Sequence, residues 1–102
     1  MAFGLKMETQ EKIRRVLAGF PEIDEVLIYG SRAKGNFRTG SDIDLALVGE
    51  NIDLTVLNRV DRQLDDLHLP WTFDLSIYHR IDNEDLLGHI RRVGKIFFKR
   101  QL

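Results

Sequence analysis

Hydrophobic residues recur at spacings of three and four in three stretches of the chain, which is the pattern of a helix with one buried face. The first stretch follows Thr9 as N-cap, the second covers about 54–67, and the third follows Asn83. Asp53, which precedes the second stretch, and Asn83 are residue types that cap helix N-termini. We therefore expect three main helices. Residues 1–8 show no such pattern and are expected to be loose.

Between these stretches lie hydrophobic segments that predict β-strands. Residues 25–29 contain a continuous apolar run, whereas 42–48 and 71–78 alternate between hydrophobic and polar side chains. Residues 95–98 are expected to form a short terminal strand or an extended tail. Because a strand, a helix and a strand follow one another from 42 to 78, a right-handed crossover is favoured. The pattern predicts an α/β (α+β) fold with a small mixed sheet of three to four strands and three to four helices.

Composition and charge narrow the class of protein. The chain has 102 residues, enough for a single domain with a core of about 9–98, and 43% of them are hydrophobic. A net charge of −1 gives no overall basic field, so we do not expect polynucleotide binding. The absence of cysteine excludes disulfides and thiolate zinc sites. No apolar run approaches the ~20 residues of a membrane span, and the first residues lack a signal-peptide pattern, so we expect a cytoplasmic protein.

Two aspartates lie on one face of the predicted strand 42–48. Side chains alternate across a strand, so Ile43 and Leu45 point to one face while Asp42 and Asp44 point together to the other. Repulsion between neighbouring carboxylates raises the pKa of one of them unless a cation is present. A divalent metal ion is the simplest reason to place two carboxylates side by side.

A glycine-serine turn follows the buried strand 25–29. Gly30 lets the backbone come close to a ligand, and backbone N–H groups together with the Ser31 hydroxyl can hold phosphate oxygens. Arg32 adds positive charge, and two interpretations of it stay open: contact with a nucleotide phosphate, or an ion pair that fixes the connector. The turn offers hydrogen-bond donors to phosphate oxygens, and the next strand offers metal ligands. Together they suit a metal-bound nucleoside triphosphate.

A third carboxylate lies on the polar face of the alternating stretch 71–78. If this strand is the neighbour of 42–48, Asp74 lies beside Asp42 and Asp44. The alternative interpretation is an ordinary surface aspartate, because one aspartate in an amphipathic strand is common.

The spacing of these residues resembles the signature of a known family. Gly30 and Ser31, followed after ten residues by Asp42 and Asp44 in an Asp-x-Asp pattern, resemble the signature of the DNA polymerase β-like nucleotidyltransferases. The surrounding wording, YGSRAKG and SDIDLALV, is similar to the minimal nucleotidyltransferases, the small single-domain branch. The resemblance covers about 25–78 and implies the nucleotidyltransferase fold.

The resemblance also implies a reaction and the residues that perform it. The family transfers a nucleoside monophosphate from a triphosphate such as ATP to an acceptor and releases pyrophosphate. Asp42 and Asp44 would bind two Mg²⁺ ions, and Asp74 would bind the ion nearer the attacking hydroxyl. Gly30 and Ser31 would hold the β- and γ-phosphates. The expected cofactor is therefore Mg²⁺, with ATP as substrate.

A partner protein is implied in the same way. Minimal nucleotidyltransferases are typically encoded beside a small helical protein of the HEPN type, which can be a toxic ribonuclease. The nucleotidyltransferase is then the antitoxin and attaches AMP to its partner, so a homo- or hetero-oligomer is expected. Two alternatives stay open: a catalytically weak subunit that controls the helical partner by complex formation, and nucleotidyl transfer to a small molecule.

Overall fold

The computed structural model of the chain, which describes residues 2–38 and 40–101, contains a four-stranded sheet in the order β3-β2-β1-β4. The elements follow one another as the 3₁₀-helix η1 (Ala2–Gly4), α1 (Met7–Ala18), β1 (Glu25–Tyr29), α2 (Gly30–Lys34), β2 (Ile43–Val48), α3 (Leu54–Asp65), β3 (Phe73–Ile77), the 3₁₀-helix η2 (Tyr78–Arg80), α4 (Glu84–Val93) and β4 (Lys95–Lys99). β1 is antiparallel to β2 and β4, whereas β2 and β3, joined through α3, are parallel. This mixed sheet with its helices confirms the predicted fold class.

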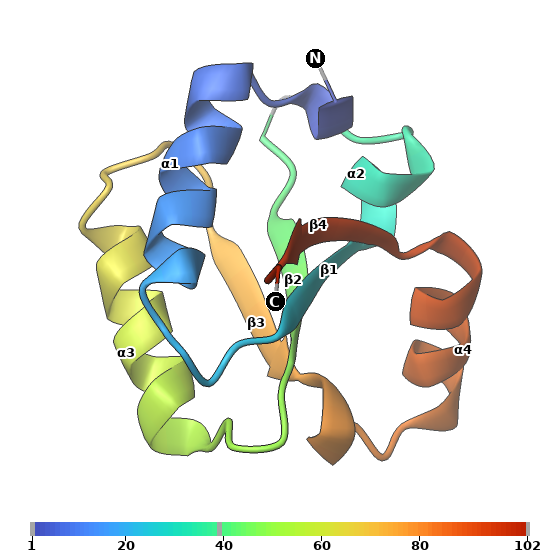
Figure 1. The fold of residues 1–102 in the computed structure, drawn as a ribbon. Helices are drawn as coiled ribbons and strands as arrows, with labels where there is room; N and C mark the ends of the chain where they lie inside the picture. The colour runs from blue at the N-terminus through green and yellow to red at the C-terminus, as the bar shows by residue number, and fades with distance from the viewer. Residues whose placement is uncertain (1, 39, 102) are drawn as a thin grey trace.

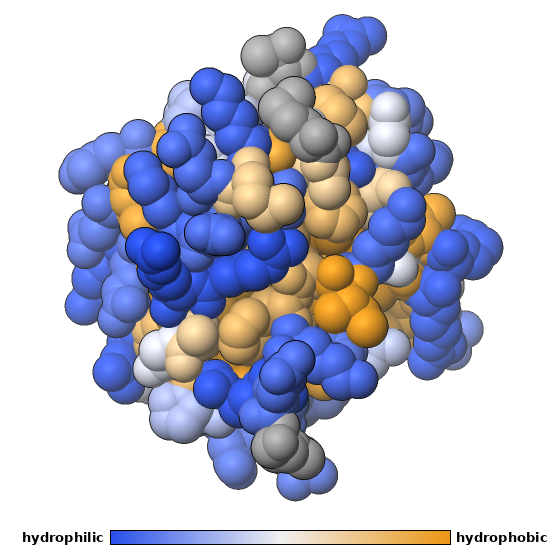
Figure 2. All heavy atoms as spheres, turned by 45° about the horizontal axis from the view of Figure 1, so that its top comes forward, coloured by the Kyte–Doolittle hydropathy of each residue, from blue (hydrophilic) through white to orange (hydrophobic). Residues whose placement is uncertain are grey.

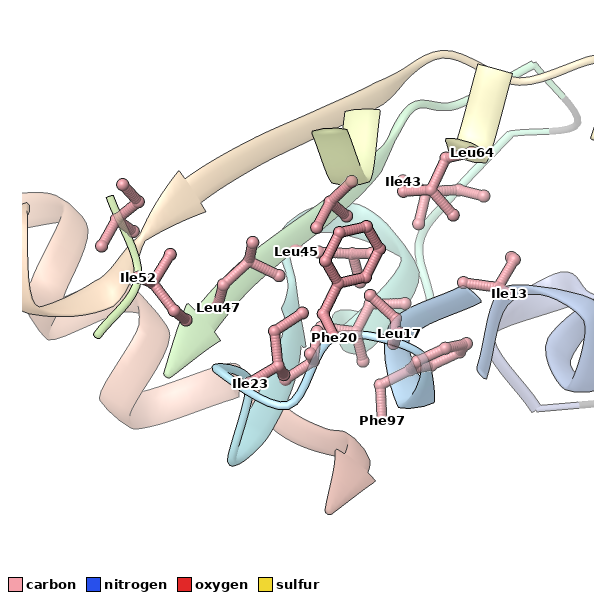
Figure 3. Close-up of a cluster of buried hydrophobic side chains, with 14 of the residues drawn as sticks. Ile13, Leu17, Phe20, Ile23, Ile43, Leu45, Leu47, Ile52, Leu64 and Phe97 are labelled. Atoms are coloured by element: carbon pink, nitrogen blue, oxygen red, sulfur yellow. The ribbon is translucent and has the colours of Figure 1, made fainter. Parts of the chain in front are cut away.

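Helices cover the two faces of the sheet unequally. In Figure 1, α1 and α3 lie together on one side of the sheet, while α4 and the short α2 lie on the other. The larger core lies under α1 and α3, and Figure 3 shows its side chains pointing toward one another from helices and strands: Ile13, Leu17, Ile43, Leu45, Leu47, Leu64 and Phe97. A small cluster that includes Tyr29, Ala46 and Ile90 lies on the α4 side. The α4 side of β2 and β3 is therefore less covered than the core side.

Two of the predicted helix starts agree with the structure. The Asp53 side chain accepts the N–H of Val56 at 3.0 Å at the start of α3, and Asn83 accepts the N–H of Leu86 at 3.0 Å at the start of α4. These bonds satisfy backbone donors that have no partner within the helix. α1, in contrast, begins at Met7, before its predicted N-cap.

The first described residues are packed, so the expectation that 1–8 are loose is wrong, with Met1 lying outside the described part. Leu5 is fully buried in the larger core. Gln10, which is also buried, donates from Nε2 to the carbonyls of Ala2 at 3.0 Å and Leu5 at 2.9 Å. Hydrophobic periodicity does not predict a side-chain amide that binds backbone carbonyls, which is why the sequence pattern missed this segment.

The surface carries hydrophilic side chains together with some exposed hydrophobic ones. Figure 2 shows one face of the molecule, on which hydrophilic residues surround a smaller group of hydrophobic ones. Among residues 2–38 and 40–101, three large hydrophobic side chains are more than half exposed, and they lie on three different elements: Met7, Leu54 and Ile96. Within the described ranges, every helix is too short or too polar to cross a membrane.

Candidate active site

Aspartates gather on the less covered face of the sheet, at β2 and β3. Asp44 and Asp74 are register partners in this parallel pair, so their side chains lie side by side on the same face. Asp42 directly precedes β2 and is exposed, whereas Asp44 is half-buried. The structure therefore brings Asp74 next to Asp44, with Asp42 at the start of the same strand. Their participation in one catalytic site stays a prediction.

The electrostatics of this group follow from burial and like charge. The pKa of the Asp44 carboxyl is raised from 3.8 to about 6, first by burial and then by the negative charges of Asp74 and Asp42. The Arg32 guanidinium opposes this shift but does not cancel it. Clustered carboxylates in a partly buried position show this behaviour because each disfavours the ionised form of the other.

The donor chemistry of the group fits a magnesium ion. Across residues 2–38 and 40–101, no three acidic or histidine side chains are arranged as a ready metal-binding group. The oxygens available at Asp42, Asp44 and Asp74 are nevertheless the ligand type that Mg²⁺ prefers. The pKa of the Asp44 carboxyl is raised first by burial and then by the charges of Asp74 and Asp42, with Arg32 opposing the shift. A cation would favour the ionised carboxylates, and its binding stays a prediction.

The glycine-serine turn lies against the same carboxylates. Gly30 follows β1 with a φ of +74°, a left-handed conformation that favours glycine. A Cβ at this position would overlap Asp44 Oδ2, so the turn has no room for a larger residue. Tyr29, just before the turn, pairs directly with Asp44 across β1 and β2. Ser31 is partly exposed in the first turn of α2.

His89 of α4 contacts this turn, which the sequence analysis did not predict. The Gly30 N–H donates to His89 Nε2 at 3.2 Å. The His89 ring also meets the Tyr29 ring edge to face, with centroids 6.2 Å apart at 80°. The Tyr29 hydroxyl lies 3.3 Å from Ser76 Oγ, and burial raises the pKa of this phenol. The hydrophobic periodicity of the helix that contains His89 cannot predict this contact, because His89 and Gly30 are far apart in the chain.

Arg32 is buried beneath the connector between α2 and β2. Its guanidinium donates to the carbonyl of Ser41 at 2.8 and 3.1 Å and to the carbonyl of Phe3 at 2.8 Å. It also lies 5.3 Å from the ring centroids of both Phe37 and Trp71. Of the two interpretations left open by the sequence, these contacts favour fixing the connector, through backbone carbonyls. A nucleotide contact by Arg32 stays a prediction.

A small mixed sheet with a glycine-serine turn set against paired carboxylates defines the nucleotidyltransferase class of fold. The family model described as polymerase beta, nucleotidyltransferase matches residues 11–102, and the chain belongs to this family. A sequence relative is the probable protein adenylyltransferase MntA of Haemophilus influenzae, with 30% identity over 90 residues that cover 87% of this chain and 78% of the relative. The resemblance seen in the sequence is therefore confirmed.

Solved structures are similar in fold. A toxin–antitoxin crystal structure with AMP-PNP has a TM-score of 0.73 and 21% identity, covering 90% of this chain and 74% of that chain. A complex of tri-AMPylated Shewanella oneidensis HEPN toxin with MNT antitoxin has a TM-score of 0.70 and 18% identity, covering 95% of this chain and 75% of that chain. At these identities the similarity establishes the shared fold.

Proposed function

We propose that this chain is a Mg²⁺-dependent protein adenylyltransferase that transfers AMP from ATP to a HEPN-type partner and thereby acts as its antitoxin in the cytoplasm. The observation that carries the proposal is the register that places Asp74 beside Asp44, with the Gly30 turn against the same carboxylate. The MntA relative is named a protein adenylyltransferase, and one structural neighbour contains an AMPylated HEPN toxin with its MNT antitoxin. These names supply the acceptor and the nucleotide of the proposal.

The residues of the site have separate roles in this reaction. Asp42, Asp44 and Asp74 would hold two Mg²⁺ ions, which would supply charge stabilisation for the reacting oxygens. Gly30 and Ser31 hold the β- and γ-phosphates through backbone N–H groups and the hydroxyl. The pKa of Asp44, raised first by burial and then by the charges of Asp74 and Asp42, supports this assignment, because a bound cation would favour the ionised carboxylate.

The chemical step joins a partner hydroxyl to the α-phosphorus of ATP. The hydroxyl oxygen forms the new bond to that phosphorus, and the bond from phosphorus to the bridging oxygen of the β-phosphate breaks. Pyrophosphate leaves with that oxygen, and Asp74 accepts the proton of the attacking hydroxyl. Asp74 is exposed on β3, so an acceptor side chain from another protein can reach it.

Labelling of the partner tests the proposal directly. The purified chain is incubated with labelled ATP, Mg²⁺ and the protein encoded by the neighbouring gene, and label on that protein is measured. Asp44→Asn should reduce labelling by at least about a hundredfold, the upper end of the loss seen when residues that merely orient metal ligands are changed. Asp61→Asn, an exposed aspartate on α3, is the matched control and should label at the wild-type rate.

Two results would contradict this assignment. Unchanged labelling in Asp44→Asn would remove Asp44 from the reaction. Neutralisation of a toxic partner that persists in both Asp42→Asn and Asp44→Asn, without label, would show a binding subunit that acts by complex formation. Circular dichroism of each variant verifies that the protein under test is folded.

A further inference from the structure

The two side chains classed as buried and polar in the described residues both bind the start of the chain. Arg32 and Gln10 are each 2% exposed. Arg32 Nη1 donates to the carbonyl of Phe3 at 2.8 Å, and Gln10 Nε2 donates to the carbonyls of Ala2 and Leu5. Burial of such groups is tolerated only when they are hydrogen-bonded, so the first residues are fixed in place. We call residues 2–5 the N-terminal strap.

The other side of the Arg32 guanidinium holds the residue before the first aspartate. Nε and Nη2 both donate to the carbonyl of Ser41, at 3.1 and 2.8 Å. The Ser41 hydroxyl in turn accepts the N–H of Arg38 at 2.8 Å, which closes the end of the connector. Two donors from one rigid fork fix the direction as well as the position of this carbonyl. Ser41 is covalently joined to Asp42, so the fork limits where Asp42 can lie.

Packing joins the strap to the connector as well. A Cβ on Gly4 would overlap the ring of Phe37, so strap and connector are in close contact. The Arg32 guanidinium lies over the rings of Phe37 and Trp71. With its nitrogens directed at backbone carbonyls and almost no exposed surface, Arg32 is poorly placed to bind a triphosphate in solvent.

We propose that Arg32 is a positioning residue for nucleotidyl transfer, which acts with the N-terminal strap to hold Ser41 and thereby aim Asp42 at the cations shared with Asp44 and Asp74. The inference rests on the proposed function. Its physical basis is that a misplacement of about 1 Å at a reacting group can lower the rate about a hundredfold. A residue that aims a metal ligand affects the chemical step, whereas a phosphate contact also affects nucleotide binding.

The division between kcat and the KM for ATP tests this role. Arg32→Met should lower kcat by about tenfold to a hundredfold and leave the KM within about twofold. Lys34→Met, which removes an exposed cation from the same short helix, is the matched control and should retain the wild-type kcat. A rise of about tenfold in KM with an unchanged kcat in Arg32→Met would overturn the proposal, because it would show a nucleotide contact.

Two further variants are informative. One separates the geometry of the Arg32 guanidinium from its charge, and the other tests whether Arg32 and the N-terminal strap act together. Arg32→Lys keeps the charge and the buried stem but loses the fork, so kcat should remain low; recovery of the wild-type rate would overturn the proposal. Gln10→Leu removes the hydrogen bonds to the carbonyls of Ala2 and Leu5, which loosens the strap, and it should lower kcat in the same direction. Combined with Arg32→Met it should cause less than the product of the two losses, whereas independent effects would contradict a shared role.

A measurement that needs no activity keeps this inference separate from the proposed function. If the wild-type chain transfers no AMP, the proposed function fails, and hydrogen exchange over residues 40–44 then decides the positioning role. Arg32→Met should speed exchange in this segment at least about fivefold while Lys34→Met leaves it unchanged. Equal exchange in both variants would overturn the inference.

Discussion

The two faces of the sheet divide stability and chemistry between them. Leu45 of β2 is fully buried under α1 and α3, while its neighbour Asp44 lies beside Asp74 on the opposite face. The first face excludes water from a continuous hydrophobic core, and the second keeps carboxylates that repel one another. The pleat of one strand separates the two environments by a single residue. The core face under α1 and α3 therefore stabilises a fold whose other face carries carboxylates that repel one another.

The largest effect is expected on the core face. Leu45→Ala should lower the free energy of unfolding by about 3 kcal/mol, because it removes buried methyl groups and leaves a cavity. Asp44→Ala, one residue away, should lower the free energy of unfolding by less than about 0.5 kcal/mol. The packing lost with the side chain is offset because the substitution removes a carboxylate that burial and like charges disfavour. Urea denaturation of the two variants measures the difference. Equal losses of unfolding free energy in the two variants would show that the two faces contribute equally to stability.

The glycine turn is the place where the second face tolerates least change. Gly30→Ala should cost about 2 kcal/mol of unfolding free energy, from the left-handed backbone and from the overlap with Asp44. Gly35→Ala is the matched control: its φ is also positive, but a Cβ there meets nothing within 4 Å, so it should cost about 1 kcal/mol. Chemical denaturation compares them, and identical losses would show that the Asp44 carboxylate moves aside freely.

The charge arrangement predicts a pH dependence with a definite sign. The pKa of Asp44 is about 6 in the folded chain and 3.8 when unperturbed, so the folded state binds this proton more tightly. The stability that the folded chain gains from binding this proton is therefore fully present below about pH 3.8 and is lost as the pH rises through 6. At pH 7, Asp44→Asn should be more stable than wild type by about 1.5 kcal/mol, half the unscreened value because the carboxyl is partly exposed. Denaturation from pH 4 to 7 should show this difference vanish toward pH 4.

The smallest effect is expected at the helix caps. Asp53→Ala removes the bond to the Val56 N–H and should cost about 1 kcal/mol of unfolding free energy. Because α3 lies on the core face, AMP transfer should not change. Asn83→Ala at the start of α4 should cost a similar amount. Thermal unfolding combined with the labelling assay checks both variants, and a changed KM in Asp53→Ala would show that the core face is coupled to the site.

The sequence predicted much of the fold and of the candidate site because the relevant patterns are local. Alternation along 42–48 separates Leu45 from Asp44, and polar residue types at 53 and 83 mark the helix starts that the structure confirms. From the sequence alone, the pairing of the strands that carry Asp44 and Asp74 stayed a condition, and the parallel register of β2 and β3 meets that condition.

Contacts between distant segments were decided only by the tertiary structure. Hydrophobic periodicity reports which face of one element is buried, and it carries no information on which distant carbonyl a side chain will meet. The bond from Gly30 to His89 and the bonds from Arg32 to Phe3 and Ser41 depend on packing among elements far apart in the chain. The residue types and their order therefore determined the sheet and its carboxylates. Three-dimensional packing alone decided what holds the turn and the connector in place, because hydrogen bonds form between groups that are close in space whatever their separation in sequence.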